Sequence, residues 1–503
     1  MLSAVSAVSA SGGNMGSSND AFYKEAQKIV GEGNITAEKE DIIVYCRDEV
    51  SQALKSYMAD YAVIPESTEQ VQAIVKLANK HNIALYPYSY GTNLSGGTSP
   101  RKGGAMVVMR KMNHILEINE ETKTATIESG VTWSKLIFET GKFGLEPLPL
   151  GGGPHTGGPI GNYSLGGGPT GAIDLNEVVA LEVVLGNGEI LRTGSMAFQG
   201  HEEINPYFRI AWGPNLTELY RGTMGSFGII TKMVRRLYPV RPIEEPIQIG
   251  FPDLASCVEG MKKVVNLGIC KQVTGLNRIQ AAAIAAPSEL LKDKAAYKAV
   301  EDMMAAWLMV ARISCHNEDQ ANVYRKLVID AITRAGGFPV QYDGKYQENL
   351  NQLWGGSSVA ACHYLRHEPN LMAFFYVPPS RIVGAYEKTM EIIKKLNYPM
   401  TSPSGDVYEP RMYLAPWERT ETFMIEFDVE FDPMDEESIN RFRQFMGMFF
   451  EATIKYGSPQ ASAGFFRNFE QGLLPSYSKL LRDIKNTTDP NHIMAPAAVF
   501  KDM

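Results

Sequence analysis

The chain has 503 residues, more than a single hydrophobic core normally supports, so two or three domains are expected. Its formal net charge of −8 argues against a nucleic-acid-binding protein, and it contains no apolar run long enough to span a membrane. Five dispersed cysteines without a C-x-x-C pair indicate reduced thiols and a cytoplasmic protein.

The N-terminal part of the chain starts with a polar tail. Residues 1–20 lack the charged front and the long apolar core of a secretory signal, so we expect them to be flexible. Helical patterns follow, with the short apolar run Ile42–Tyr45 as a strand candidate between them. The first regular domain is therefore expected to begin near residue 21.

A strand–helix–strand unit is predicted between residues 61 and 85. Tyr61–Ile64 has the composition of a strand, and Ser67 with Gln70 matches a capping box that starts a helix. The apolar residues at 71, 74, 75 and 78 fall on one helix face. A second buried strand is expected at Ile83–Leu85, and ligands of open α/β sheets bind beyond the carboxyl ends of such strands.

The glycine-rich stretch from Pro87 to Gly97 follows this strand directly. It has no charge, and its small residues expose backbone N–H groups that a ligand can approach closely. A phosphate or pyrophosphate is the expected guest, although neither the nucleoside-triphosphate P-loop nor the G-x-G-x-x-G fingerprint is present. The alternative is a tight surface loop between two strands.

Two further tracts of small residues follow in the chain. Residues 151–168 contain nine glycines, and residues 221–228 lead into an apolar strand pattern. Strand patterns flank the first tract closely, with a hairpin signal at Asn187–Gly188, which argues against a disordered linker. Close approach of the backbone to a large flat ligand would explain so many glycines.

The composition changes after about residue 242, where prolines and then amphipathic helices replace the glycine tracts. Phe423–Phe431 alternates between apolar and acidic residues from Ile425 onward, as expected of a strand with one buried face. Its acidic face carries Glu426 and Asp428, for which we expect a solvated surface, with acid–base chemistry as the alternative. An α+β domain of about 200 residues is therefore predicted.

Taken together, the glycine tracts resemble the FAD-linked oxidase superfamily that includes vanillyl-alcohol oxidase and the flavoprotein subunit of para-cresol methylhydroxylase. The resemblance rests on the Gly91–Gly97 loop, the Gly157–Asn162 tract, the Gly225–Lys232 segment and the ending Asp489–Pro496. It implies an α+β protein with a two-part FAD-binding domain, residues 21–242 and 457–503. An α+β substrate cap domain at residues 243–456 would be inserted between the two parts.

The resemblance also implies FAD as the cofactor, with contacts in all three tracts. Backbone N–H groups of the first loop would hold the pyrophosphate, and the second tract would line the isoalloxazine and the ribityl chain. The third would contact the far end of the cofactor through a backbone group. The implied cofactor-binding residues are Tyr90, Gly91, Thr92, Asn93, Leu94, Gly157, Gly158, Ile160, Gly161, Asn162, Ile230 and Asn468.

Three residues are candidates for catalysis: Arg467, Glu426 and Tyr408. Arg467 matches a family arginine and would hold a substrate anion or stabilise charge on the reduced flavin, with a surface ion pair as the alternative. Tyr408 is a candidate pocket residue. The tyrosine and the aspartate that serve phenol oxidation in the family are replaced by Gly96 and Pro149.

The histidine that carries covalent flavin in the family falls near Thr422 or Phe423 here, so dissociable FAD is expected, with a covalent link to a tyrosine as the alternative. His155, inside the second tract, is a candidate for a covalent link or for a base, although an ordinary loop histidine is the preferred interpretation. The spacing of His363 and His367 does not match a metal site, and no metal is expected.

The expected function is that of an FAD-dependent oxidoreductase. It would abstract a hydride from an alcohol, a hydroxy acid or an activated aromatic C–H onto flavin N5. The alternatives are a dehydrogenase subunit that passes electrons to a cytochrome or iron–sulfur partner, and a flavin-binding scaffold without turnover. The expected partners are a small organic substrate and an electron-acceptor protein, and the expected assembly is a homodimer or a hetero-oligomer.

Overall fold

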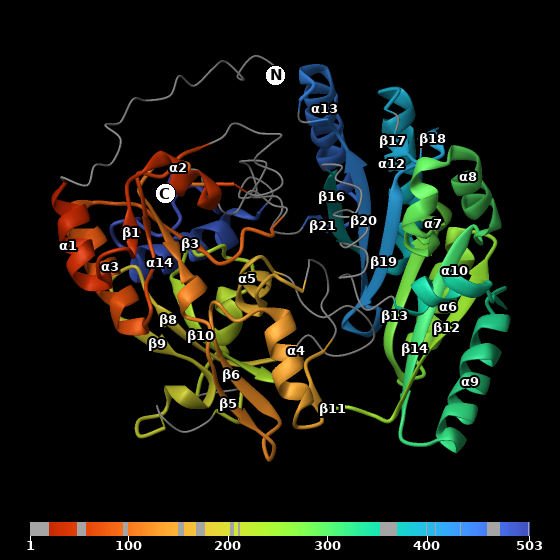
Figure 1. Cartoon of the computed structure of the whole chain (residues 1–503), viewed down its shortest axis with the longest axis horizontal. Helices are drawn as coiled ribbons and strands as arrows, with labels where there is room; N and C mark the ends of the chain where they lie inside the picture. The colour runs from red at the N-terminus through yellow and green to blue at the C-terminus, as the bar shows by residue number, and fades with distance from the viewer. Residues whose placement is uncertain are drawn as a thin grey trace.

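Two bodies, each of mixed helix and sheet, lie side by side in the computed structural model (Figure 1). The N-terminal body runs from α1 to β11 and includes α14 near the end of the chain, whereas the central body runs from β12 to β21. The predicted fold class, a two-part domain with a second domain inserted, is therefore confirmed. The described residues are 20–47, 57–93, 99–148, 155–166, 177–201, 206–209, 212–352, 370–398, 400–407, 409–432, 434–459, 473–500 and 502–503.

The first sheet of the N-terminal body contains the predicted strand–helix–strand unit. Its strand order is β1 (Ile35–Thr36), β2 (Tyr61–Val63), β4 (Ala105–Val108) and β3 (Leu85–Tyr88). Helices α1 (Ala21–Val30) and α2 (Lys39–Ile42) come before β2, and α3 (Thr68–His81) connects β2 to β3. β2 and β3 both run parallel to β4. The Ser67 hydroxyl accepts a hydrogen bond from the Gln70 N–H at 3.3 Å, which confirms the predicted helix start.

The second sheet of this body is antiparallel. Its strand order is β5 (Ile115–Asn119), β6 (Thr124–Glu128), β10 (Ile229–Arg236), β8 (Val178–Val184) and β9 (Ile190–Arg192). β8 and β9 form the predicted hairpin. Helices α4 (Trp133–Gly141) and α5 (Pro159–Ser164) and the paired strands β7 (Leu145–Glu146) and β11 (Tyr238–Pro239) complete the regular elements described here.

Helix α14 (Pro475–Thr488) brings the chain back to the N-terminal body (Figure 1). The residues after it run beside β3. The Leu85 N–H donates to the Ile493 carbonyl at 2.7 Å, and the Ala495 N–H donates to the Leu85 carbonyl at 2.8 Å. This C-terminal segment therefore extends the first sheet at β3, the strand that leads into the glycine-rich loop.

The central body is built on one eight-stranded antiparallel sheet. Its strand order is β15 (Phe338–Pro339), β12 (Ile243–Phe251), β14 (Trp307–Cys315), β13 (Cys270–Asn277), β19 (Arg411–Trp417), β20 (Thr422–Glu430), β16 (Asn370–Val377) and β21 (Ser458–Pro459). A separate hairpin joins β17 (Met400–Ser402) and β18 (Gly405–Val407).

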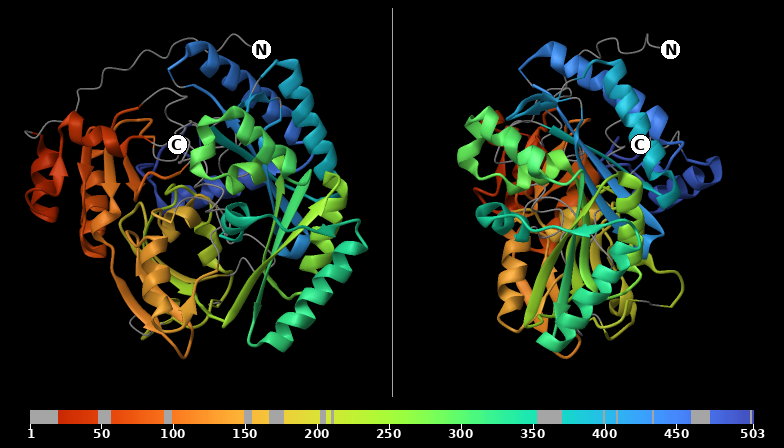
Figure 2. Two further views of the ribbon diagram at one scale, coloured as in Figure 1. Left: turned by 45° about the vertical axis from the view of Figure 1, so that its right-hand side comes forward. Right: turned by 90° about the vertical axis from the view of Figure 1, so that its right-hand side faces the viewer.

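Helices lie on both sides of this sheet (Figure 2, right). One face packs against α6 (Leu254–Val265), α9 (Glu318–Thr333), α12 (Ile382–Lys395) and α13 (Glu436–Thr453). The other face packs against α7 (Arg278–Ala285), α8 (Lys294–Met303) and α10 (Gly344–Asn351). Among the helices that the structure describes, none is both long and apolar enough to cross a lipid bilayer.

Candidate cofactor site

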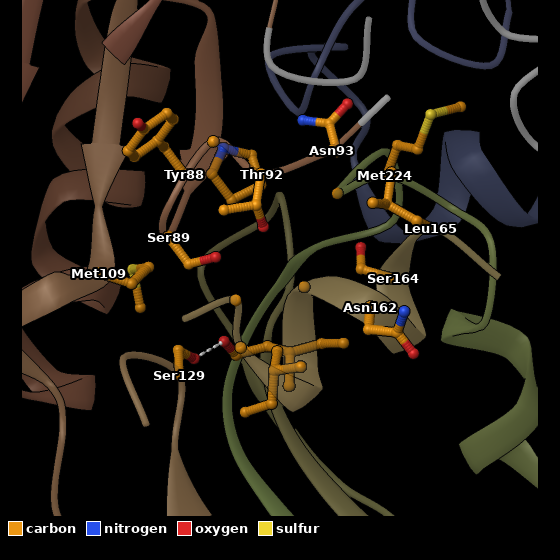
Figure 3. Close-up of a pocket in the computed structure, with 18 of the residues that line it drawn as sticks. Tyr88, Ser89, Thr92, Asn93, Met109, Ser129, Asn162, Ser164, Leu165 and Met224 are labelled. Carbon is orange, nitrogen blue, oxygen red and sulfur yellow. Dashed lines mark hydrogen bonds between the residues drawn. The ribbon is translucent and has the colours of Figure 1, made fainter. Parts of the chain in front are cut away.

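A pocket lies at the carboxyl end of β3, between the loop after this strand, helix α5 and the segment before β10 (Figure 3). Its polar side chains are hydroxyls and amides, and none of its described lining residues carries a charge. The lining residues are Pro87, Tyr88, Ser89, Gly91, Thr92, Asn93, Met109, Ser129, Trp133, Gly157, Gly158, Ile160, Gly161, Asn162, Ser164, Leu165, Met224, Gly225, Gly228 and Ile230.

The first wall is the loop that β3 feeds. Gly91 has a φ of +67°, and a Cβ added there would lie 2.5 Å from the Tyr88 hydroxyl oxygen, so this turn requires glycine. Tyr90 is not among the lining residues, and its hydroxyl donates to the Gly130 carbonyl at 2.6 Å. The Arg110 Nε donates to the Ser89 carbonyl at 3.0 Å, and its guanidinium carbon lies 5.4 Å from the centre of the Tyr90 ring. These contacts tie the loop to Gly130 and to Arg110.

Helix α5 forms the second wall. Gly158 caps its N-terminus, and a Cβ added to Gly161 would lie 3.1 Å from the Ser89 hydroxyl oxygen of the facing loop. The two walls thus approach each other as closely as they do because Gly161 has no side chain. Figure 3 shows Asn162 and Ser164 of this helix across the pocket from Ser89.

The segment before β10 forms the third wall. Gly225 has a φ of +80°, and a Cβ there would overlap the Pro87 ring, lying 2.8 Å from Pro87 Cδ. Met224 also has a positive φ, 49°, which is unusual for a residue with a long side chain. The Ser129 hydroxyl donates to the carbonyl of Ile230, the bond drawn as a dashed line in Figure 3.

This lining suits a long ligand with a flat ring and a polar chain. Trp133, Ile160 and Met224 supply apolar surface, and Thr92 and Asn162 supply hydrogen-bonding groups. The glycines that line the pocket leave backbone groups open to a ligand where side chains would otherwise stand. An anionic group would be held here by backbone N–H groups instead of by lysine or arginine side chains. The residues present therefore fit FAD.

The structure brings together most of the predicted cofactor residues. Nine of them line the pocket, and Tyr90, which does not, is bonded to Gly130 beside the lining residue Ser129. Leu94 and Asn468 lie outside the described residues, as do the catalytic candidates Arg467 and Tyr408. The nine residues that line the pocket are Gly91, Thr92, Asn93, Gly157, Gly158, Ile160, Gly161, Asn162 and Ile230.

Sequence reasoning missed several pocket residues between the glycine tracts. Ser129 and Trp133 reach the pocket because β6 ends at Glu128 and α4 begins at Trp133. The pair Ser129–Gly130, small residues directly after the alternating polar and apolar run that forms β6, was the available signal. Met109 follows β4 in the same way and carried no motif at all.

The acidic face of β20 is buried, so the expectation of a solvated surface was wrong. Glu426 is 4% exposed and Asp428 is 1% exposed. They share the sheet face that packs against α7, α8 and α10, because residues on one strand alternate between two covered faces. Neither residue lines the pocket described above.

The buried acids of β20 interact with one another and with the neighbouring strand. Arg411 of β19 places its Nε 3.8 Å from Asp428 Oδ2, and its Nη2 donates to Glu430 Oε1 at 2.6 Å. Burial raises the pKa of Glu426 well above its usual value, and the charge of Asp428 and a hydrogen bond with it raise that pKa further. Glu426 therefore retains a proton to higher pH than an ordinary glutamate.

His155 lies beside the pocket without lining it. Its carbonyl accepts hydrogen bonds from the Ser134 N–H at 3.0 Å and from the Ser134 hydroxyl at 3.1 Å, which ties it to α4. Burial lowers the pKa of its imidazole, so the ring is neutral near pH 7. Across the described ranges, no three His, Cys, Asp or Glu side chains gather as a metal ion would require.

Comparison with known proteins identifies the part of the chain that carries most of the pocket. Residues 59–194 match the family described as the FAD binding domain. The chain is 32% identical over 227 residues to glycolate oxidase subunit GlcD of Bacillus subtilis, covering 44% of this chain and 46% of that one. It is 30% identical over 247 residues to the 4-cresol dehydrogenase [hydroxylating] flavoprotein subunit of Pseudomonas putida, covering 47% of each. The matched region thus spans about half the length of these curated relatives.

The fold is that of a solved flavoenzyme. The crystal structure of p-cresol methylhydroxylase with bound substrate superposes with a TM-score of 0.80 at 21% identity, over 95% of this chain and 96% of that one. The fold and the pocket define an FAD-binding protein, and FAD is its cofactor. The FAD binding domain, the similarity to the 4-cresol dehydrogenase flavoprotein subunit and the fold of p-cresol methylhydroxylase agree with the resemblance predicted from the glycine tracts.

Proposed function

We propose that the chain is an FAD-dependent oxidoreductase that removes a hydride from an alcohol, a hydroxy acid or an activated aromatic C–H. The observation that carries this proposal is the uncharged pocket at the end of β3, most of which lies within the matched FAD binding domain. The names of a glycolate oxidase subunit and of a 4-cresol dehydrogenase subunit among its relatives support this range of substrates.

The pocket residues divide into two roles in this proposal. Backbone N–H groups of Gly91, Thr92 and Asn93 hold the pyrophosphate, as expected of an uncharged loop at a strand end. The tract from Gly157 to Asn162 and the backbone of Ile230 hold the remaining length of the cofactor. When bound, FAD supplies a hydride acceptor at its N5 atom.

The substrate side of the reaction falls to Glu426, Arg467 and Tyr408. Burial and the charge of Asp428 raise the pKa of Glu426, so its protonated form, which donates a hydrogen bond to a substrate oxygen in this proposal, persists to higher pH than that of an ordinary glutamate. Arg467 binds an anionic substrate group. Tyr408 is a further candidate for the substrate side.

A second candidate function is a dehydrogenase subunit that delivers electrons to a partner protein. It is favoured because both curated relatives named above are described as subunits. Oxygen consumption during turnover separates an oxidase from this alternative, in which only an artificial dye or a protein acceptor is reduced.

The proposal is tested on the purified protein in two steps. The visible spectrum before and after acid precipitation reports whether FAD is present and dissociable. Anaerobic mixing with glycolate, D-lactate and 4-cresol then reports which substrate class bleaches the flavin absorbance. No bleaching by any alcohol, hydroxy acid or alkylphenol would support the scaffold without turnover and contradict the proposal.

The role of Glu426 is tested in the same assay. Glu426→Gln should slow flavin reduction at least tenfold, within the usual range for loss of a proton-transfer group. Glu421→Gln is the matched control, because Glu421 is exposed immediately before β20. Equal rates for the two variants would remove Glu426 from the reaction.

A further inference from the structure

Lys485 is a buried cation that joins helix α14 to two other parts of the N-terminal body. These are the turn before β10 and the C-terminal segment after α14. The lysine side chain is 1% exposed. Its Nζ donates to the Ser226 carbonyl at 2.6 Å, to Asp489 Oδ2 at 2.6 Å and to the Met494 carbonyl at 2.8 Å. An ammonium group has three N–H donors, and each of these has a partner here.

One of these bonds reaches the wall of the cofactor pocket. Ser226 directly follows Met224 and Gly225, which both line the pocket. Both have a positive φ, so this wall has a conformation that the local sequence does not favour by itself. The bond from Lys485 to the Ser226 carbonyl holds this turn from outside the pocket.

The other two bonds reach the opposite wall through the C-terminal segment. The Asp489 carboxylate accepts the Ile493 N–H at 3.1 Å and the Met494 N–H at 2.9 Å. Ile493 in turn pairs with Leu85 of β3, the strand that leads into Pro87 and the glycine-rich loop. The two walls meet where Gly225 packs against Pro87.

We infer that Lys485 is a positioning residue for FAD binding, which holds the Met224–Gly225 wall against the wall built from β3. The segment from Lys485 to Ala495 then supports the walls of the cofactor site, although none of its residues lines the pocket described above. This inference rests on the proposed function, because it takes the pocket as the place where FAD binds.

Two variants of the buried pair separate a positioning role from a purely structural one. Lys485→Met removes the bond to Ser226, whereas Asp489→Asn leaves that bond in place and disturbs the C-terminal segment alone. Asn491→Ala is the matched control in the same segment. Its amide donates to Asn79 Oδ1 at 2.8 Å on α3, away from both walls.

The experiment titrates FAD into the apoprotein of each variant and measures the dissociation constant from the change in flavin absorbance. Unfolding of the same apoproteins in urea is measured in parallel. Lys485→Met should raise the dissociation constant about tenfold or more, as expected for loss of a hydrogen bond from a charged group. Asp489→Asn should have a smaller effect, and Asn491→Ala none.

The outcomes distinguish this inference from the proposed function. A wild-type protein that binds no FAD overturns the proposed function itself. A wild-type protein that binds FAD, together with a Lys485→Met variant of equal affinity, overturns only the role of Lys485. If Lys485→Met does not fold because Asp489 loses its counterion, the double variant Lys485→Met/Asp489→Asn removes that charge and should show the same weak binding. Unchanged affinity in the double variant, or its failure to fold, overturns the inference.

Discussion

At the scale of single residues, the pocket depends on glycines whose missing side chains set the distance between its walls. Glycine is required at position 225 for two separate reasons. Its φ is +80°, and a Cβ added there would overlap the Pro87 ring. The first reason concerns backbone conformation and the second concerns space. Both can be tested because Gly200 has the same φ of +80° with no atom within 4 Å of its Cβ position.

Gly225→Ala is expected to weaken FAD binding at least tenfold, since relief of the contact with Pro87 must move one of two pocket walls. Gly200→Ala should lower the free energy of unfolding by about 1 kcal/mol, from backbone strain alone, and leave FAD binding unchanged. Titration of the apoproteins with FAD checks both expectations. Equal affinity of the two variants would show that the contact with Pro87 has no bearing on the cofactor.

The raised pKa of Glu426 predicts a pH dependence of stability. The groups that face it are Asp428 on the same strand and Tyr413, opposite it on β19, with Arg411 beside them. Because the folded state holds the proton more tightly than the unfolded state, this group stabilises the fold below about pH 4.5 and loses that contribution as the pH rises towards its raised pKa.

Glu426→Gln should therefore stabilise the protein at pH 7 relative to the wild type, and the difference should shrink towards pH 4. Each unit by which the pKa is raised corresponds to about 1.4 kcal/mol. Urea unfolding at a series of pH values measures this difference. A difference that stays constant across the series would mean that Glu426 titrates normally.

At the scale of elements, local patterns in the sequence predicted those features that depend on neighbours in the chain. The α3 start at Ser67, the β8–β9 hairpin and the loop after β3 all follow from residues within a few positions of each other. The Ile42–Tyr45 run was predicted as a strand and is helical, because four apolar residues do not distinguish the two structures.

The acidic face of β20 shows what local patterns do not contain. Alternation identified Glu426 and Asp428 as neighbours on one face, and this is observed. It carried no information about what covers that face, which depends on α7, α8 and α10. The same limit applies to Lys485, whose partners at Ser226 and Met494 are set by tertiary packing.

At the scale of the whole molecule, the two bodies are joined close to their connection by a buried lysine that contacts two partly buried glutamates. Lys271 of β13 is 7% exposed and places its Nζ 2.5 Å from Glu146 Oε1 of β7, and it also contacts Glu244 of β12. Burial raises the pKa of Glu146, and the lysine opposes that shift. Since every described lining residue of the pocket belongs to the N-terminal body, this contact stabilises the domain arrangement without touching the cofactor site.

Lys271→Met should reduce stability by about 2–3 kcal/mol, because two partly buried carboxylates lose their common cation. Thermal unfolding should shift to lower temperature and divide into two transitions, while the FAD dissociation constant stays the same. Lys262→Met is the control, because its exposed pair with Glu259 lies within α6 and contributes less than about 1 kcal/mol. A variant that loses FAD would contradict the independence of the site from the central body.

The pairing of the C-terminal segment with β3 also has a consequence for biosynthesis. The Tyr86 hydroxyl donates to the Pro496 carbonyl, 410 residues further along the chain. At the usual speed of a ribosome, roughly 20–80 s pass between synthesis of these two residues. During that time one edge of β3 lacks its neighbour and is open to pairing with other chains. Nascent chains are therefore expected to benefit from a chaperone at this edge, and the inferred role of Lys485 predicts that FAD binds tightly only after translation has passed Pro496.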